Sequence, residues 1–192
     1  MSGMCKLREL RISSAVIDYC SCNKLMTVLQ RLDALNYHFA LSAGVSQRDF
    51  EFFMSAVESQ RHNLRELTVT VDRAKCHDDA FPPRSDPWCL VPYSCLVELD
   101  IPLESLYGGP SSGCYRLLSL FPPSVEVLAL SSPGFQAYVM LALEALSLAV
   151  DQLPNLKKVV LHKDWYMSRW FDPRLAAVAR RFAEQGIIYM YE

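Results

Sequence analysis

Cysteine and histidine are the residues of this sequence that could bind a metal ion. Cys76 and His77 are adjacent, and Cys89 and Cys95 follow in the same proline-rich stretch. Thiolate and imidazole groups are the ligands that tetrahedral zinc prefers. The stretch has no Cys-x-x-Cys pair to hold two ligands at once, so the spacing favours free cysteines. We therefore expect neither a metal nor a cofactor.

The histidines also give no sign of nucleophilic catalysis. A catalytic Ser or Cys needs a base beside it, and the sequence contains no nucleophile elbow and no Cys–His signature. The glycine-containing turn 109–113 lacks the lysine of a phosphate-binding loop. An enzyme with a dispersed active site would need paired catalytic groups, and none converge in the sequence. We predict that the protein is not an enzyme. The four histidines are His38, His62, His77 and His162.

Two other segments have residue types that are typical of contact sites. Residues 72–95 contain four prolines and several aspartates, which predicts a long irregular loop. Such a loop is either a contact site or a tolerated insertion. Residues 164–171 concentrate Trp, Tyr, Phe and Arg, which are common in binding hot spots. Packing of these aromatics between the last strands and the terminal helix is the favoured alternative.

Composition and charge limit the class of partner. The chain has 192 residues, 51% of them apolar, and its 19 Lys and Arg against 21 Asp and Glu give a formal charge of -2. This balance does not attract a polyanion, so we expect no nucleic acid partner. The most apolar segment, 135–150, is too short for a membrane span and is interrupted by polar residues. We predict a single domain over residues 1–192 with a buried helix there and no membrane partner.

The cysteines and the N-terminus predict a location inside the cell. The seven cysteines are not spaced as a disulfide framework, which fits a reducing compartment. Lys6, Arg8 and Glu9 lie where a signal peptide would need its apolar core. We therefore expect an intracellular protein, either cytoplasmic or nuclear.

A repeated pattern, apolar-x-x-apolar-x-apolar, organises the whole chain. Its first positions are 25, 32, 32, 29 and 31 residues apart, and a further 31 residues lead to a degenerate seventh copy at Ile187. A regular period of this length predicts stacked structural repeats. The six clear copies are Leu7-Leu10-Ile12, Leu32-Leu35-Tyr37, Leu64-Leu67-Val69, Leu96-Leu99-Ile101, Val125-Leu128-Leu130 and Leu156-Val159-Leu161.

Each copy predicts a strand followed by a helix. The copies end in period-2 alternation, which indicates short half-buried strands, and segments of helical period lie between them. We expect an α/β solenoid of about six to seven repeats, with parallel strands on its concave side and helices on its convex side. The helical segments centre on residues 25–32, 50–57 and 175–182, the second starting near Gln47. Asp172 as N-cap, Pro173 at the first helical position and Gly186 as the stop predict a capping helix and strand over 172–192.

The repeats resemble leucine-rich repeats. The segments that carry the resemblance include Leu-Arg-Glu-Leu-Arg-Ile at 7–12 and Leu-Val-Glu-Leu-Asp-Ile at 96–101. The irregular periods, with Pro-Pro-Ser-Val-Glu-Val-Leu-Ala-Leu at 122–130, are similar to the degenerate repeats of fungal F-box-type proteins. No F-box precedes the first repeat of this chain, and its copies lack the asparagine that regular repeats place after the last strand leucine. The resemblance implies a non-enzymatic protein-interaction module. The alternative is the substrate-receptor part of an F-box ubiquitin-ligase subunit, a ligase adaptor, that lacks its F-box.

Strand alternation places the residues between the core positions on the concave face. Glu66, Glu98 and Asp100 give this face an acidic, solvent-exposed centre, and Val127, Ala129 and Val160 make its C-terminal part apolar. Such a graded surface suits a protein partner. The residues that we predict to bind it are Glu9, Arg11, Asn36, His38, Glu66, Thr68, Glu98, Asp100, Lys158 and His162.

The first predicted strand begins at Leu7, and nothing in the sequence covers its outer edge. Natural proteins seldom leave an open sheet edge and a bare end of the core. We therefore expect either that the chain is the C-terminal piece of a longer solenoid, or that a partner such as a second copy occupies this end.

Overall fold

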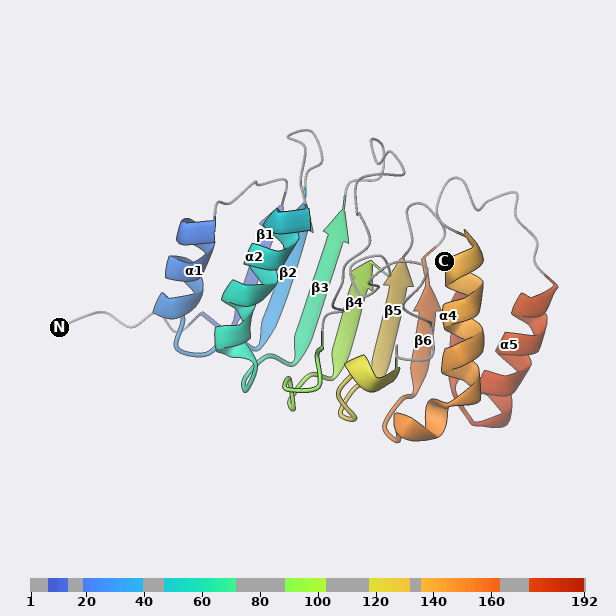
Figure 1. The fold of residues 1–192 in the computed structure, drawn as a ribbon. Helices are drawn as coiled ribbons and strands as arrows, with labels where there is room; N and C mark the ends of the chain where they lie inside the picture. Colours follow the sequence, from blue (N-terminus) through green and yellow to red (C-terminus); the bar gives the residue numbers. More distant parts are fainter. Residues whose placement is uncertain are drawn as a thin grey trace.

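The computed structural model describes residues 7–13, 19–39, 47–71, 89–102, 118–131, 136–162 and 173–191, and all structural statements below concern these residues. They form an α/β structure built on one parallel sheet with seven strands in sequential order (Figure 1). The strands are β1 (Glu9–Ser13), β2 (Ala34–Phe39), β3 (Glu66–Val71), β4 (Glu98–Pro102), β5 (Val127–Ser131), β6 (Lys158–Leu161) and β7 (Ile188–Tyr191).

The predicted repeat spacing is confirmed between the first six strands. Glu9 pairs with Ala34, Ala34 with Glu66, and Glu66 with Glu98. The same register continues through β5 and β6. Because each pair joins residues at equivalent positions of the sequence repeat, the core positions form continuous rows across the sheet.

The last spacing is 30 residues, because Lys158 pairs with Ile188, and the expected spacing of 31 is wrong there. The cause is the end of the preceding helix. Gly186 has a φ of 74°, its N–H donates to the carbonyl of Ala183, and the Ile187 N–H donates to the carbonyl of Phe182. These two bonds form a Schellman motif, so Gly186 ends the helix as predicted and the chain turns directly into β7.

Helices cover one face of the sheet. They are α1 (Tyr19–Val28), α2 (Gln47–Val57), α4 (Gln136–Leu148) and α5 (Arg174–Glu184), with 3-10 turns η2 (Glu58–Gln60), η5 (Leu118–Leu120) and η6 (Val150–Gln152). In Figure 1 all four α-helices lie on the same side of the strands. α1 packs against α2 at one end of the sheet, and α4 packs against α5 at the other. None of the described helices is both long and apolar enough to cross a lipid bilayer.

Three helix boundaries can be compared with the prediction. α2 begins at Gln47 as expected, although Ser46 lies outside the described residues. The first helix was expected over residues 25–32 but ends at Val28, because Leu32 is buried as the first core position of the next repeat. α5 begins at Arg174 with Pro173 at its N-cap, so Pro173 does not occupy the first helical position. Asp172 lies outside the described residues.

The core lies between the sheet and the helices. Leu67, Leu99 and Leu128 occupy equivalent positions on neighbouring strands and are at most 1% exposed. The helices contribute Met54 and Leu143, both fully buried. Burial weakens at β1, where Leu10 and Ile12 are half-buried and Leu7 is exposed. No described strand pairs with the outer edge of β1.

The middle of the core is covered by irregular backbone in the described residues. Leu90, Tyr93 and Phe121 are buried there, and the Leu90 N–H donates to the carbonyl of Leu120. Burial raises the pKa of the Tyr93 hydroxyl far above its usual value. Residues 72–88 of the predicted loop lie outside the described residues, as do 103–117.

A repeated hydrogen-bond pair joins successive strands at their start. The Arg8 carbonyl accepts from the N–H groups of both Asp33 and Ala34, at 2.8 and 3.0 Å. In the next repeat the Asp33 carbonyl accepts from Arg65 and Glu66 in the same way. Three further repeats have the same arrangement, with acceptors at residues 65, 97 and 126. Between β6 and β7, only the Ile188 N–H donates to the Lys157 carbonyl, because the Ile187 N–H donates to the Phe182 carbonyl at the end of α5.

A buried glutamine forms hydrogen bonds with the backbone of the turn between α1 and β2. Gln60 is 3% exposed, and its side-chain amide nitrogen donates to the carbonyls of Met26 and Leu29. Its side-chain oxygen accepts from the Leu32 N–H at 3.1 Å. All of the side chain's heavy polar atoms are therefore satisfied, as a buried amide requires. The contact joins the first repeat to the second.

Ion pairs at the strand starts add electrostatic stabilisation. Asp33 binds Arg8 at 2.9 Å and Arg31 at 2.8 Å. The hydrogen bond from Arg31, reinforced by Arg8, holds the pKa of the Asp33 carboxyl below its ordinary value of 3.8, against a smaller opposing effect of desolvation. The three side chains connect the chain before β1 to the chain before β2.

The fold predicts that Leu99→Ala lowers the free energy of unfolding by about 2 to 5 kcal/mol, because it leaves a cavity in the central row of the core. Chemical denaturation measures this change. Leu148→Ala is the matched control, since Leu148 on α4 is 69% exposed and its loss should cost less than about 0.5 kcal/mol. Equal losses in the two variants would mean that the strand register is wrong.

We also predict that Asp33→Asn destabilises the protein at pH 7 by less than about 1 kcal/mol, because its ion pairs are partly exposed. The folded-state pKa of Asp33 is depressed, so the stabilisation is present above pH 3.8 and is lost as the pH falls through the folded-state value. Urea denaturation at pH 7 and pH 3 should show a larger difference from wild type at pH 7. A difference of the same size at both values would exclude the ion pairs as its source.

Candidate interaction face of the sheet

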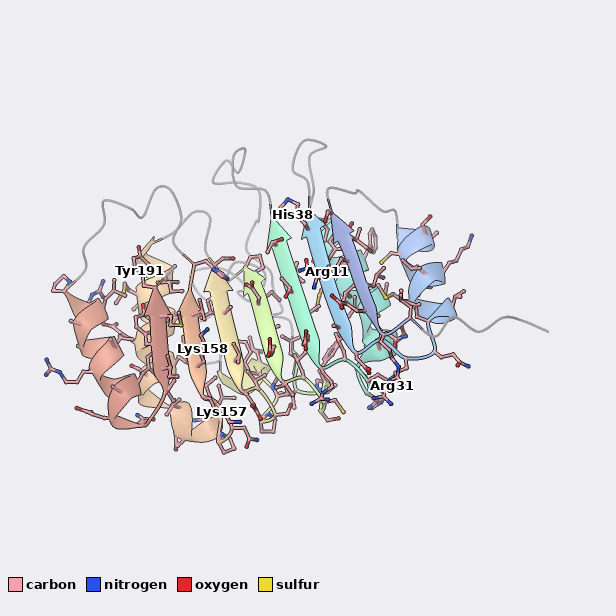
Figure 2. All side chains as sticks on the ribbon, turned by 180° about the vertical axis from the view of Figure 1, so that it is seen from behind. Arg11, Arg31, His38, Lys157, Lys158 and Tyr191 are labelled. Atoms are coloured by element: carbon pink, nitrogen blue, oxygen red, sulfur yellow. The ribbon has the colours of Figure 1, made fainter. Side chains whose placement is uncertain are left out.

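The face of the sheet opposite the helices carries the candidate site, and we call it the open face. Figure 2 views the molecule from this side, with the strands in front of the helices and Arg11, His38 and Lys158 labelled. The strand alternation predicted this face for the first six strands, and the structure adds Ile188 and Met190 of β7. It consists of Glu9, Arg11, Ser13, Ala34, Asn36, His38, Glu66, Thr68, Thr70, Glu98, Asp100, Pro102, Val127, Ala129, Ser131, Lys158, Val160, His162, Ile188 and Met190.

The N-terminal part of the open face is polar. Arg11 binds Glu9 on its own strand at 2.6 Å, and both side chains are more than half exposed. His38 on β2 is half-buried, and its Nδ1 lies 2.8 Å from the Thr70 hydroxyl on β3. This bond spans neighbouring strands, so it fixes the imidazole against the sheet. Asn36 and Thr68, at the middle row, are half-buried as well.

Two carboxylates without partners stand at the centre of this face. Glu66 and Glu98 are directly opposite each other in register on β3 and β4, and both are exposed. Neither forms an ion pair within the described part of the chain. Adjacent strands lie about 4.8 Å apart, so the two like charges are close. Their repulsion would be relieved by a cation from outside.

Asp100 differs from this pair, and the expectation that it is solvent-exposed is wrong. Its side chain is 21% exposed, and its Oδ2 lies 3.1 Å from Nε2 of His162. His162 follows β6, so the contact reaches across β5, where the small Ala129 is 8% exposed. The other carboxylate oxygen, Oδ1, is buried without a hydrogen-bond partner. The acidic centre is therefore a pair of glutamates.

The C-terminal part of the open face is more covered than expected. Of the three residues predicted to form an apolar surface there, Val160 is 5% exposed, Ala129 is 8% exposed and Val127 is half-buried, so they do not form an exposed apolar surface. Lys158 is half-buried, while Ile188 on β7 is 60% exposed. The accessible apolar group at this end is therefore the edge residue Ile188, which the prediction did not include.

The two histidines of the open face take part in separate contacts. The His38–Thr70 contact joins β2 to β3, whereas the Asp100–His162 contact joins β4 to β6, so the imidazoles do not converge on one point. No group of three or more His, Cys, Asp or Glu side chains in the described ranges is placed to hold a metal ion. Cys89 and Cys95 are free thiols, and Cys76 and His77 lie outside the described residues, as does the aromatic segment 164–171.

A second surface escaped the sequence analysis. A solvent-open groove of about 530 Å³ runs along the edge of the sheet at which the strands begin, which we call the start edge. The sequence does contain a signal for this surface, because the residue before the first apolar position is polar in five of the six clear copies: Lys6, Arg31, Asn63, Ser124 and Asn155. The described lining residues are Arg31, His62, Asn63, Arg65, Ser94, Cys95, Val97, Ser124, Glu126 and Asn155.

The open face predicts that Glu98→Lys leaves the fold intact and raises the free energy of unfolding by a few tenths of a kcal/mol. The substitution turns a like-charge pair on neighbouring strands into an opposite-charge pair. The gain should shrink in 0.5 M salt, where screening is strong. Urea denaturation measures both effects, with Glu184→Lys on α5 as the charge-matched control. A loss of more than about 1 kcal/mol would show that Glu98 has a structural role.

Comparisons with known proteins add no identification. No protein-family model matches the chain, and no curated protein or solved structure is significantly similar to it. What the protein does is therefore inferred from its own residues and their arrangement.

Proposed function

We propose that this protein is a non-enzymatic interaction module that binds a protein partner through the open face. The observation that carries the proposal is the exposed pair of Glu66 and Glu98, held in register on a face that no described helix covers. Two carboxylates on neighbouring strands, with no cationic partner among the described residues, form a ready acceptor for a positively charged group.

The size and shape of the open face favour a protein over a small molecule. Six strand spacings of about 4.8 Å and strands of about five residues give a surface of roughly 29 by 17 Å. That area, about 490 Å², is much broader than a small ligand and is somewhat more than half of the about 800 Å² that each partner buries in a standard protein interface. A small substrate would need an enclosing pocket, whereas Glu66 and Glu98 at the centre of the face are exposed.

The chemistry of the open face defines the partner further. A guanidinium is the group that best matches two neighbouring carboxylates, because it presents several donors in a fixed plane. Thr68, beside the glutamates, offers a hydroxyl, and the exposed Ile188 at the far end offers an apolar contact. The proposed partner therefore presents an arginine at its centre and an apolar residue toward the β7 side.

The proposal includes the finer fold assignment, a solenoid similar to leucine-rich repeats. Three observations support it: consecutive parallel strands at a spacing of about 30 residues, leucines in register at the core positions, and the strand-start hydrogen bonds that recur in each repeat. Repeat proteins commonly bind partners along their extended sheet surface. We further propose an intracellular location, which the free thiols of Cys20, Cys22, Cys89 and Cys95 support.

The test is differential capture with matched variants. The immobilised wild-type protein, the Glu66→Lys/Glu98→Lys variant and the Glu51→Lys/Glu184→Lys control are exposed to the same cell extract, and the bound proteins are quantified by mass spectrometry. The control residues lie on α2 and α5, away from the open face. Reversal of both central charges should reduce capture of the specific partner at least tenfold, because it replaces attraction with repulsion. The control should bind as wild type.

The purified partner then provides a direct measurement. Its affinity for the wild-type protein should fall with salt, as expected for association that depends on exposed charges. The proposal fails if the partner binds the wild-type protein and the Glu66→Lys/Glu98→Lys variant equally well while both remain folded. It also fails if the protein converts a substrate in the absence of any protein partner.

A further inference from the structure

We propose that the groove along the start edge is a second binding site, for an extended acidic peptide segment. This groove is separate from the open face. In Figure 2, Arg31 and Lys157 lie at the end of the strands opposite His38, which marks the start edge at both sides of the sheet. The groove passes the starts of β3 to β6, and Arg31 before β2 also lines it.

Hydrogen bonds between repeats give the groove a fixed wall. The Asn155 amide nitrogen donates to the Pro123 carbonyl at 2.8 Å, and the Ser124 hydroxyl donates to the Leu96 carbonyl at 2.7 Å. One repeat earlier, the Cys95 thiol contacts the His62 carbonyl at 3.2 Å. In each case a polar side chain before the first core position reaches back to the preceding repeat. The wall is therefore built by the repeat itself, which holds the lining residues at regular intervals.

Near the start of β3, several hydrogen-bond donors of the lining have no partner among the described residues. Arg65 is exposed and forms no ion pair with the described residues, and the side chains of Asn63 and Ser94 have no hydrogen-bond partner there. His62 accepts a hydrogen bond from Arg61 at Nε2, so its remaining ring nitrogen carries a proton as a donor. A guanidinium, an amide, a hydroxyl and an imidazole N–H together match the oxygens of a carboxylate and of a peptide backbone.

The neighbouring charged residues of the lining already form ion pairs. Arg31 shares the carboxylate of Asp33 with Arg8, which leaves one net positive charge there, and the one carboxylate in the described lining, Glu126, is bound to Lys157 at 2.6 Å. Arg65 is the lining arginine that forms no ion pair with the described residues. It lies between these two ion pairs, so an acidic side chain of the occupant would bind near the start of β3.

The length of the groove favours a peptide over a free anion. The lining residues come from five consecutive repeats, so the groove spans four strand spacings, or about 19 Å. An extended chain advances about 3.3 Å per residue, so about six residues would fill it. A single phosphate ion would occupy only a small part of the 530 Å³. The neutral side chains of Ser124 and Asn155 would then face the less charged end of the peptide.

NMR titration of the isotope-labelled protein tests this proposal. The probe is a hexapeptide of alternating Glu and Ser with blocked ends, and the control peptide has Gln in place of each Glu. We expect saturable shifts at His62, Arg65 and Ser94 with the acidic peptide and an affinity at least about tenfold lower for the Gln peptide. The Arg65→Gln substitution should lower the affinity for the acidic peptide about tenfold. The Arg180→Gln substitution, which replaces an exposed arginine on α5, should change this affinity less than twofold.

Several results would overturn the proposal. They are the absence of saturable binding, equal affinity for the two peptides, shifts confined to the open face, and an unchanged affinity in a folded Arg65→Gln variant. Displacement of the peptide by inorganic phosphate at equal concentration would identify a small-anion site instead. The Glu66→Lys/Glu98→Lys variant separates this site from the proposed function, because it should lose the protein partner of the open face but still bind the acidic peptide.

Discussion

The paired hydrogen bond at each strand start is the interaction on which the rest of the structure depends. One backbone carbonyl accepts from two consecutive N–H groups of the next repeat, as Arg8 does from Asp33 and Ala34. A slip of one residue would move every core side chain of the strand to the other face of the sheet, so the register must be held where the strand begins. The arrangement recurs from β1 to β6 and gives way only at β7, where the cap of α5 uses one of the two N–H groups.

This register creates two chemically different surfaces from adjacent residues. Arg65 and Glu66 are neighbours in the chain, yet the arginine lines the groove at the start edge and the glutamate belongs to the open face. Because successive repeats are in register, equivalent residues of neighbouring strands lie side by side and form rows across the sheet. An exposed charged residue therefore lies next to the equivalent residues of the adjacent repeats. The carboxylates on the open face suit a cationic partner, and the donors along the start edge suit an acidic one. The two proposed sites therefore select partners of opposite charge.

The sequence was sufficient to predict what the repeat itself determines. The spacing of the leucines predicted the parallel order, the pairing of Leu67 with Leu99 and the identity of both faces. It could not predict contacts that depend on how far a side chain reaches. The His162 side chain reaches across β5 to meet Asp100, and the two β5 residues on this face that lie nearest the contact, Ala129 and Ser131, are both small. Gln60 was unremarkable in the sequence because the three backbone groups that it binds come together only after α1 has packed. The groove was missed for a related reason, since its lining precedes the apolar positions that mark each repeat.

Hydrogen exchange of individual backbone amides tests the central claim about register most directly. In native conditions, both N–H groups of each strand-start pair should be protected: residues 33 and 34, 65 and 66, 97 and 98, 126 and 127, and 157 and 158. Their protection factors should rise together toward the value set by global unfolding, because each pair shares one acceptor inside the sheet. The account would be contradicted if only one amide of each pair were protected, or if the protected pairs were displaced by one residue along the chain.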